Sequence, residues 1–440
     1  MDYTLSFTDK EVTPWAGLGF LKGMMDKMGF SQKISTLDII PQPNSNRGYC
    51  PETIIEAFMV SIWCGANRFL HTEVTRHDRA LADIFGWDRV PGNDTYKRFF
   101  RKFDLEASSK YSDALFKWTF NNIAFDRYTL DCDSTILTRY GKQQEGAEKG
   151  YNPKKPGRDS HHPLLAFVND LKLVANLWLR PGNTSSANNF AAFLEDTINK
   201  LQNKKIGLIR LDSGFYSKEV LDFLEKKELN YVTAVRFYKP IQKMISLEQA
   251  WLPVSDGIEI CETEYQSENW QNPRRIVVVR QKVDDRPDAV GKHLSLFEGT
   301  QFYYRYRYTA YVTNLELPAV EVWRLYRQRA DSENRIKEIK EDFGFDSFNL
   351  KDFYATEAAL TTAVIAYNLM AMFRMFVLNS KVQHKLSTLR YKTFAIGAFF
   401  QKINGKYILK IALARQRRKW FLGLWNESNS IKSPFIFSNA

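Results

Sequence analysis

The chain has 440 residues, a formal net charge of +12 and an isoelectric point near 9.3. Its 50 acidic residues are ordinary for a globular protein, so the basic excess indicates a polyanionic partner, with nucleic acid as the leading candidate. No lysine-rich amphipathic helix or lipidation signal accompanies the charge, which argues against a membrane partner. The length predicts about three domains, or one domain with large insertions.

The cysteines and the N-terminus favour a cytoplasmic location. Cys50, Cys64, Cys132 and Cys261 are widely spaced, so the sequence indicates neither a disulfide framework nor a zinc knuckle. The first residues lack the basic and apolar regions of a secretion signal. The longest apolar run, AALTTAVIAYNLMAMF at 358–373, is shorter than the ~20 residues of a membrane span, and we expect it to form a buried helix.

Residues 1–125 are expected to form a helical DNA-binding domain. Pro51 suits the first turn of a helix over PETIIEAFMVSIWCGA, and another helix is expected to begin near Asn93 and Asp94. The second of these helices interleaves aromatic residues with four basic ones, Lys97, Arg98, Arg101 and Lys102. The basic residues form either a phosphate-binding face or an ordinary solvated face, and the sequence leaves both open.

Residues 126–237 predict the first part of an α/β core. Short strand-like runs such as RYTLDCDST, PLLAFVND and LKLVANLWLR come first. The helix ANNFAAFLEDTINKL, the strand IGLIRLDSGF, the helix SKEVLDFLEKKEL and the strand NYVTAVRF follow. This alternation predicts a mixed sheet with parallel members, covered by helices.

Residues 238–317 are expected to form a β-rich insertion. Its last strand, QFYYRYRYTAYVTN, alternates an aromatic face with a basic one. The aromatic face is better explained as core than as a base-stacking platform, and it comprises Phe302, Tyr304, Tyr306 and Tyr308. On the opposite face, Arg305 and Arg307 are candidate contacts to DNA phosphates.

Residues 318–380 predict a helix from Val322 to Phe345, followed by the buried helix. At ~100° per residue, one arc of the first helix carries Tyr326, Arg329, Glu333 and Lys340. An apolar stripe beside that arc comprises Leu325, Ile336, Ile339 and Phe343. Taken alone, this pattern favours an exposed face stabilised by i, i+4 ion pairs over the wall of a functional site. The last part, 381–440, is a basic C-terminal region whose Arg415, Arg417, Arg418 and Lys419 either contact phosphate or form a solvated face.

Three acidic residues occupy positions where sites are commonly built. Asp133 lies in an expected buried strand, where an ionised carboxylate is costly unless it meets a cation or hydrogen-bond donors. Asp212 ends the strand IGLIRL, and Glu333 lies on the helix described above. An all-oxygen site of this kind suits Mg²⁺ or Mn²⁺, and two such ions would activate a nucleophile for attack on a phosphodiester. Asp131 shares the face of Asp133 and is expected to tolerate Asn better than Asp133 does.

The same residues resemble a known family. Tyr326, Arg329, Glu333 and Lys340 reproduce the Y-x2-R-x3-E-x6-K signature of DDE transposases from bacterial insertion sequences. LDCDST and RLDSGF resemble the first and second aspartate motifs of these enzymes, and GYNPKKPGR and HHPLLAF are most similar to the insertion-sequence 1380 family. The resemblance spans most of the chain.

The resemblance implies an RNase H-like catalytic core interrupted by a β insertion. It implies that Asp133, Asp212 and Glu333 hold the metal ions, while Tyr326, Arg329 and Lys340 hold DNA phosphate near the cleaved end. The implied activity is metal-dependent hydrolysis at transposon ends and joining of the 3′-hydroxyl to target DNA, by a homodimer in a synaptic complex in the bacterial nucleoid. Two alternatives remain: a domesticated DNA-binding protein that no longer transposes, and an RNase H-like host nuclease.

Overall fold

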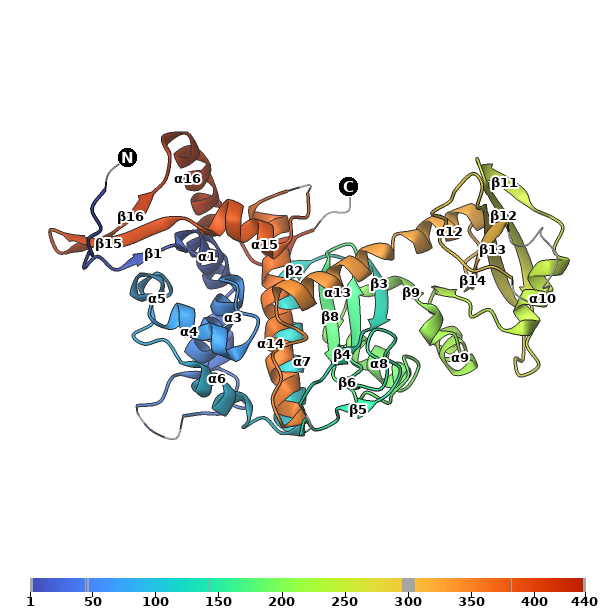
Figure 1. Ribbon diagram of the computed structural model, residues 1–440, viewed down its shortest axis with the longest axis horizontal. Helices are drawn as coiled ribbons and strands as arrows, with labels where there is room; N and C mark the ends of the chain where they lie inside the picture. Colours follow the sequence, from blue (N-terminus) through green and yellow to red (C-terminus); the bar gives the residue numbers. More distant parts are fainter. Residues whose placement is uncertain are drawn as a thin grey trace. The chain divides into compact units, whose positions relative to one another are not determined.

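A computed structural model describes residues 3–43, 45, 47–141, 143–294, 305–380 and 382–437 (Figure 1). The chain divides into two compact units, which we describe separately. The helical unit comprises Met1–Phe125, Arg139–Ala147 and Arg335–Ala440, and the sheet unit comprises Asp126–Thr138 and Glu148–Asn334. The five-part domain division expected from the sequence stays a prediction.

The helical unit is built around α14, Phe353–Met372, whose residues from Ala358 to Met372 are all buried. Trp63 at the end of α3 (Pro51–Trp63) donates its indole N–H to the carbonyl of Ala366 at 3.1 Å. From α7 (Leu105–Asn121), the hydroxyl of Tyr111 lies 2.9 Å from that of Thr362. Phe353–Val377 is long and apolar enough to cross a membrane, but 89% of its most apolar window is buried inside the protein. The expectation of a buried helix here is confirmed.

Shorter helices complete the helical unit. Those of the N-terminal part are η1 (Ala16–Leu18), α1 (Gly19–Lys27), α2 (Phe30–Ser35), η2 (Phe69–Thr72), α4 (Glu73–Arg76), α5 (Arg79–Phe85) and α6 (Asn93–Phe100). The C-terminal part adds the π-helical turns η4 (Phe373–Val377) and η5 (Arg390–Phe394), with α15 (Leu386–Leu389) and α16 (Arg415–Ser430). The expected start of α6 is confirmed, and its aromatic residues Tyr96, Phe99 and Phe100 are buried. The predominance of helices before residue 125 is likewise confirmed.

Two small sheets also belong to the helical unit. The three-stranded sheet has the order β1 (Val12–Thr13), β15 (Gly397–Ile403), β16 (Lys406–Ala412). The two-stranded sheet pairs β2 (Ile123–Ala124) in parallel with β17 (Phe435–Ile436).

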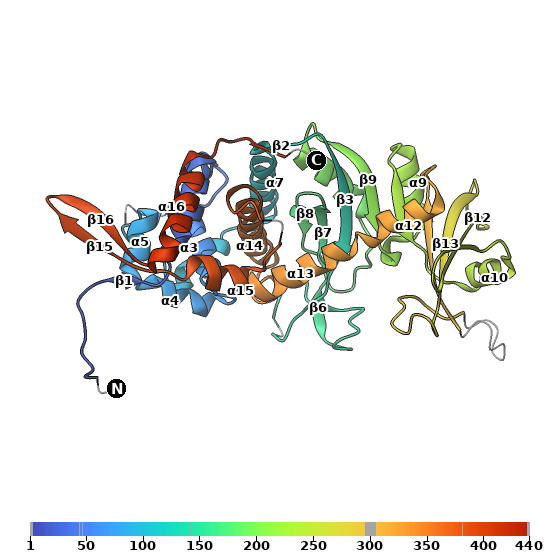
Figure 2. The same ribbon diagram turned by 90° about the horizontal axis from the view of Figure 1, so that it is seen from above.

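The sheet unit contains a nine-stranded mixed sheet with the order β11-β12-β13-β14-β10-β9-β3-β7-β8. Figure 2 labels its strands β3, β7, β8 and β9. Its strands before the insertion are β3 (Arg127–Ser134), β7 (Leu164–Val168), β8 (Leu173–Trp178), β9 (Lys205–Leu211) and β10 (Tyr231–Ala234). β9 runs parallel to both β3 and β10, whereas β7 and β8 continue the sheet as antiparallel strands. A separate small sheet has the order β4 (Leu137–Thr138), β6 (Asp159–His161), β5 (Glu148–Lys149). The mixed sheet with parallel members is confirmed.

The strands of the expected insertion extend this same sheet. They are β11 (Leu252–Ser255), β12 (Ile258–Tyr265), β13 (Arg274–Lys282) and β14 (Tyr306–Thr313), with the helix α10 (Lys239–Leu247) before them. β14 pairs antiparallel with β10, so one hydrogen-bonded ladder connects the insertion strands to the strands that carry the aspartates. Tyr308 is buried as expected, whereas Phe302 and Tyr304 lie outside the described residues.

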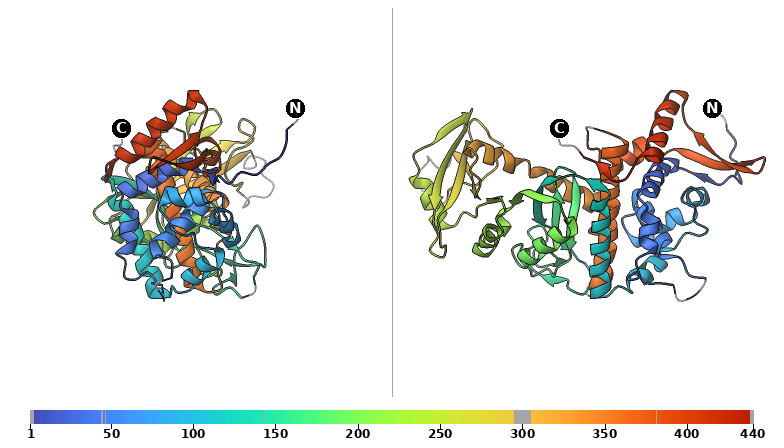
Figure 3. Two further views of the ribbon diagram at one scale, coloured as in Figure 1. Left: turned by 90° about the vertical axis from the view of Figure 1, so that its left-hand side faces the viewer. Right: turned by 180° about the vertical axis from the view of Figure 1, so that it is seen from behind.

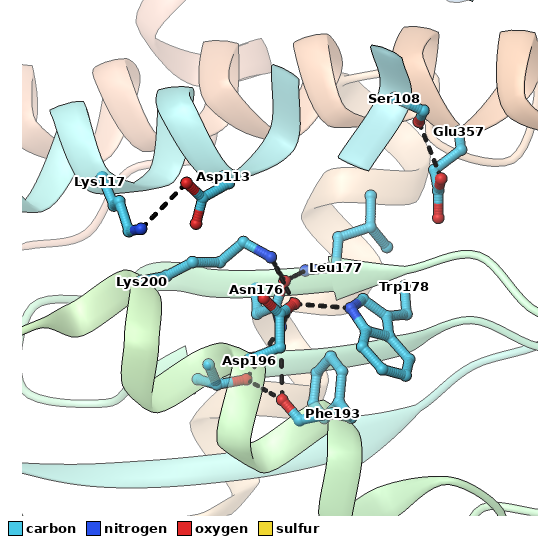
Figure 4. Close-up of polar contacts among 11 residues, drawn as sticks. Ser108, Asp113, Lys117, Asn176, Leu177, Trp178, Phe193, Asp196, Lys200 and Glu357 are labelled. Atoms are coloured by element: carbon cyan, nitrogen blue, oxygen red, sulfur yellow. Dashed lines mark hydrogen bonds and ion pairs between the residues drawn. The ribbon is translucent and has the colours of Figure 1, made fainter. Parts of the chain in front are cut away.

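Helices α8 (Phe190–Leu201) and α9 (Lys218–Lys226) follow the strands of the core. A polar cluster fastens α8 to the edge strand β8 (Figure 4). Asp196 accepts hydrogen bonds from the Asn176 amide at 2.9 Å and from the Trp178 indole at 2.7 Å, and Lys200 donates to Asn176 at 3.0 Å. These hydrogen bonds give the buried Asn176 and Lys200 polar partners and attach α8 to β8.

The single helix expected from Val322 to Phe345 is wrong. The segment forms two helices, α12 (Ala319–Arg327) and α13 (Ala330–Asp342), separated by a turn at Gln328 and Arg329. Short-range hydrogen bonds make this turn, because the Arg329 N–H donates to Tyr326 and the Ser332 N–H donates to Arg329, each at 2.9 Å. Across this turn the Arg329 side chain is 5% exposed and the Glu333 side chain is 72% exposed, with 3.9 Å between them.

Candidate active site

The site begins with the pairing of β3 and β9. The parallel register places Asp131 opposite Arg210 and Cys132 opposite Leu211, so Asp133 and Asp212 follow at the next level. Because adjacent strands lie about 4.8 Å apart and alternate residues share a face, these two aspartates are neighbours on one face of the sheet. The sequence placed each aspartate near the end of a strand, and the register shows in addition that these two strands are neighbours.

A buried ion pair forms the floor beneath this pair of aspartates. Arg210 donates to both carboxylate oxygens of Asp131, at 2.6 and 2.7 Å, and neither side chain is exposed. The Ser332 hydroxyl donates to the same carboxylate at 2.7 Å, and Arg210 also donates to the Leu325 carbonyl at 2.6 Å. Asp131 thus joins both strands to α12 and α13, and its greater tolerance of Asn relative to Asp133 stays a prediction.

Asp133, one level above, is also paired with an arginine. The Arg329 guanidinium lies 2.9 Å from its Oδ2, while its Oδ1 accepts the Ser134 N–H at 2.8 Å. Burial raises the pKa of Asp133 to about 6, which Arg329 opposes and the neighbouring Asp212 and Glu333 carboxylates reinforce. Burial, more than the neighbouring charges, therefore disfavours the ionised form of Asp133.

Asp212 directly follows β9, where it caps the 3₁₀ turn η3 (Ser213–Phe215). Its Oδ1 accepts the Gly214 N–H at 2.8 Å. A Cβ on Gly214 would come within 2.8 Å of both the Asp212 Oδ1 and the Ser186 Oγ. Glycine at this position therefore allows the backbone to approach the carboxylate closely.

Glu333 lies in the first turn of α13, with its Oε1 3.9 Å from the Arg329 guanidinium. Its charge reaches Asp133, as the pKa of that carboxyl shows, but its side chain extends into solvent. Within the described part of the chain, no three acidic, histidine or cysteine side chains surround one point closely enough to hold a metal ion. The structure brings Asp133 and Asp212 together and leaves Glu333 at the margin of the site.

A groove of about 910 Å³ runs from this margin over the insertion strands. Its walls include Ser213, Tyr308, Tyr311, Trp323, Tyr326, Arg329 and Glu333. The Tyr326 ring packs against Tyr311 with centroids 4.4 Å apart, and burial raises the Tyr326 pKa above its ordinary value. Trp323 packs in the core between α12 and strands β12 and β13, so α12 holds Tyr326 at the groove while anchored on the insertion.

The remaining predicted DNA-binding residues lie on other elements than the aspartates. Lys340 is half-buried near the end of α13, in the portion of that helix that belongs to the helical unit. Arg305 is exposed just before β14, and Arg307 is half-buried in β14 opposite Gln281. Their predicted contacts to DNA stay predictions.

Sequence reasoning missed a hydrogen-bonded chain beside the aspartates. The Ser134 hydroxyl lies 2.8 Å from that of Ser186 and 3.0 Å from His162 Nε2. His162 Nδ1 lies 2.6 Å from the Thr184 carbonyl, which fixes the Nδ1 proton and leaves Nε2 to accept from Ser134. The dipeptide HisHis before a strand was the available signal, but histidine spacing alone does not identify such a role.

The fold and the site define an α/β protein with two aspartates at the ends of adjacent parallel strands, beneath a buried arginine. The sequence profile of the family described as "Transposase DDE domain group 1" matches residues 2–427, so the chain belongs to that family. This makes it a transposase of the DDE class. The family assignment confirms the coarser part of the resemblance inferred from the sequence.

No curated protein matches this sequence. Among solved structures, the chain is similar to the piggyBac transposase in a cryo-EM structure of its synaptic complex with hairpin DNA. The identity is 14%, the TM-score is 0.48, and the match covers 85% of this chain and 78% of that chain. The family profile, and not this likeness, is the basis of the assignment.

Proposed function

We propose that the protein cleaves the ends of an insertion sequence by metal-dependent phosphodiester hydrolysis and joins the 3′-hydroxyl to target DNA. The observation that carries this proposal is the adjacency of Asp133 and Asp212, with the pKa of Asp133 raised by burial and by neighbouring carboxylates. A divalent cation would supply the positive charge that this oxygen-rich cluster lacks. The catalytic core is proposed to be RNase H-like and most similar to that of the insertion-sequence 1380 family.

The donors present fit Mg²⁺ or Mn²⁺, because the side chains of Asp133, Asp212 and Glu333 supply only carboxylate oxygens. Two bound ions would activate the attacking water or 3′-hydroxyl and stabilise the leaving oxygen. Arg329 is already ion-paired with the Oδ2 of Asp133. A change of the Arg329 and Glu333 side-chain rotamers would bring the Glu333 carboxylate toward the two aspartates. Arg329 would then be available for a DNA phosphate.

Tyr326, Arg329 and Lys340 are proposed to bind phosphates of the cleaved end. The groove supports this role for Tyr326 and Arg329, because both line it together with Glu333. Arg305 and Arg307 are proposed to bind the DNA backbone from the insertion strands. A homodimer in a synaptic complex would bring two ends together, and the bacterial cytoplasm, at the nucleoid, is the proposed location.

The test uses duplex DNA that carries the sequences flanking the gene, incubated with the full-length protein and Mg²⁺. Single replacements of Asp133, Asp212 and Glu333 by Ala should abolish cleavage and leave binding to the duplex largely intact. The matched control is Glu264→Ala, which removes an exposed carboxylate from β12. Full cleavage by Asp212→Ala, or cleavage in EDTA, would contradict the proposal.

The same reaction separates the alternatives. A transposase yields products in which the end is joined to a target plasmid, whereas a host nuclease yields cut DNA without joined products. A domesticated DNA-binding protein would bind the duplex without cutting it. Joined products that depend on Asp133 would support the proposed function alone.

A further inference from the structure

The hairpin formed by β15 and β16 extends away from the helices of the helical unit (Figures 1 and 3). The two strands pair from Gly397↔Ala412 to Ile403↔Lys406 and are closed by Asn404 and Gly405, both with positive φ. This is the geometry of a two-residue hairpin turn, whose twist matches that of the strands. At about 3.4 Å per residue, the seven-residue strands extend roughly 22 Å.

Only the base of the hairpin is packed on the protein. There β15 pairs with β1, and Ala398 is 1% exposed. From Gln401 to Ile408 every residue is exposed, including Tyr407 at 72%. A long two-stranded ribbon that no other described strand joins beyond its base is marginally stable alone, and its open edges are available to a partner.

The charge of this region points to a polyanion. No Asp or Glu occurs from Ala358 to Asn426, and residues 358–440 carry the whole +12 of the chain, because the preceding residues are balanced. The hairpin itself contributes Lys402, Lys406 and Lys410, all exposed. A protein partner with an apolar interface would not require this one-sided charge.

The lysines stand on both faces of the ribbon. Lys410 lies opposite Phe399 in the register and shares its face, where Lys10 is also placed, 4.9 Å from the Phe399 ring centroid. Lys406 belongs to this same face by alternation. Lys402 lies on the other face, with its ammonium 5.6 Å from the centroid of the Tyr407 ring. A ribbon charged on both faces can contact phosphates on either side of it.

Helix α16 continues the basic surface from the end of β16. Its exposed first turn and a half carries Arg415, Arg418 and Lys419. Its opposite face is fixed by Phe421 and Leu424, and the Phe421 ring packs 4.8 Å from that of Phe20 on α1. The aromatic packing therefore holds the arginines at a fixed position beside the base of the hairpin.

We propose that the β15–β16 hairpin is a DNA-binding ribbon that enters the major groove of duplex DNA, with its lysines and the α16 arginines on the flanking phosphates. The major groove of B-DNA, about 12 Å wide, admits a two-stranded ribbon. The inference relies on the proposed function only in taking duplex DNA as the partner.

The first test measures how affinity for a duplex carrying the flanking sequence depends on salt. The full-length triple variant K402A/K406A/K410A should bind more weakly, with a slope of log K against log salt about 2.7 smaller than the parent's, because each lost phosphate contact removes ~0.9. The control K27A/K110A/K117A removes the same charge from α1 and α7 of the same unit and should leave the slope unchanged. Equal slopes for the hairpin variant and the parent would overturn the proposal.

The second test asks whether the ribbon enters the groove. Bound parent protein should protect guanine N7, which lies in the major groove, from dimethyl sulfate. A variant in which Gln401–Ile408 is replaced by Asn-Gly keeps the pair Phe400↔Leu409 next to a two-residue turn, and should lose that protection while keeping its melting temperature. Retained protection in this variant would overturn the proposal. The proposal would also be overturned if the variant bound DNA as the parent does but no longer formed a dimer in sedimentation, because the hairpin would then contact a second copy of the chain.

Cleavage distinguishes this inference from the proposed function. If the parent fails to cut DNA but the hairpin variants still lose binding and groove protection, the proposed DNA-binding ribbon is supported and the proposed catalytic function is contradicted. If the parent cuts DNA and the hairpin variants bind DNA and protect the major groove as the parent does, the catalytic proposal is supported and the proposed DNA-binding ribbon is contradicted.

Discussion

Arg210 and Asp131 form a two-point ion pair across the parallel strands β9 and β3, with neither side chain exposed to solvent. The pair lies one level below Asp133 and Asp212, and it binds α12 and α13 to the sheet through Leu325 and Ser332. Removal of one member would leave the charge of the other buried without a partner. The main role of the ion pair is to hold the strands and helices of the site in one arrangement.

The pair predicts a large loss of stability in single variants. Asp131→Asn or Arg210→Met should each destabilise the protein by about 3–5 kcal/mol, because an uncompensated buried group remains. The double variant D131L/R210M should recover part of that loss. Urea unfolding gives the free energies, and Glu321→Ala, which breaks an exposed pair with Arg324, should cost under about 1 kcal/mol. Equal costs for the buried and exposed pairs would contradict this account.

Arg329 is predicted to compete with the metal for Asp133. Replacing Arg329 by Gln removes the guanidinium 2.9 Å from Asp133, which should lower the melting temperature without metal. The added stabilisation by Mg²⁺ should then exceed that of the parent, because the carboxylates repel one another more strongly. Thermal unfolding with and without Mg²⁺ measures both effects. A purely structural arginine would lower both melting temperatures equally.

The raised pKa of Asp133 predicts a pH window for metal binding. Its pKa lies near 6 in the folded protein and at 3.8 ordinarily, so between those values the folded state binds more protons than the unfolded chain. The free energy of unfolding of the metal-free protein therefore falls as pH rises through about 6. The stabilising contribution of protonated Asp133 is fully present below about pH 4. Because the metal needs the ionised carboxylate, Mg²⁺ should raise the melting temperature above pH 6 and lose this effect at pH 5. An equal metal effect at both pH values would refute the assignment of Asp133 as a ligand.

Gly214 offers a test of how accurately Asp212 must be placed. A methyl group at Gly214 would lie 2.8 Å from the Asp212 Oδ1 and the Ser186 Oγ, so Gly214→Ala should displace the carboxylate. We expect at least a ~10-fold loss of cleavage rate with a small change in melting temperature, because the displaced groups are the ends of side chains. The control is Gly423→Ala, because a Cβ at Gly423 would meet open space. Gly86→Ala is less suitable, because Gly86 has a positive φ that strains alanine. Gly423→Ala should leave cleavage unchanged.

The sequence predicted the strands and helices of the core because their apolar periods are strong, as in IGLIRL and the run at 358–373. It also placed Asp133 and Asp212 at strand ends, where parallel pairing brings them together. The prediction of one continuous helix failed at Gln328 and Arg329, where the helical period of the sequence continues although the backbone forms a turn. At that turn Arg329 forms its ion pair with Asp133 from a strand far away in the sequence, and no local pattern records this contact.

The role of Asp131 was likewise beyond the sequence. Its partner Arg210 lies 79 positions away, and an arginine inside a strand of apolar residues gave no indication of which carboxylate it meets. The pattern of two aspartates on one face was correct. The register of β3 with β9 places Asp131 opposite Arg210, whereas Asp133 pairs with Arg329 from the turn between α12 and α13.

The antiparallel pairing of β14 with β10 limits how this protein can be shortened. If residues 238–317 were excised, β10 would become a bare edge, with unpaired N–H and C=O groups along Tyr231–Ala234. Such an edge recruits strands from other molecules. A minimal nuclease made by that deletion would therefore aggregate unless a replacement strand or a charged cover were designed for β10.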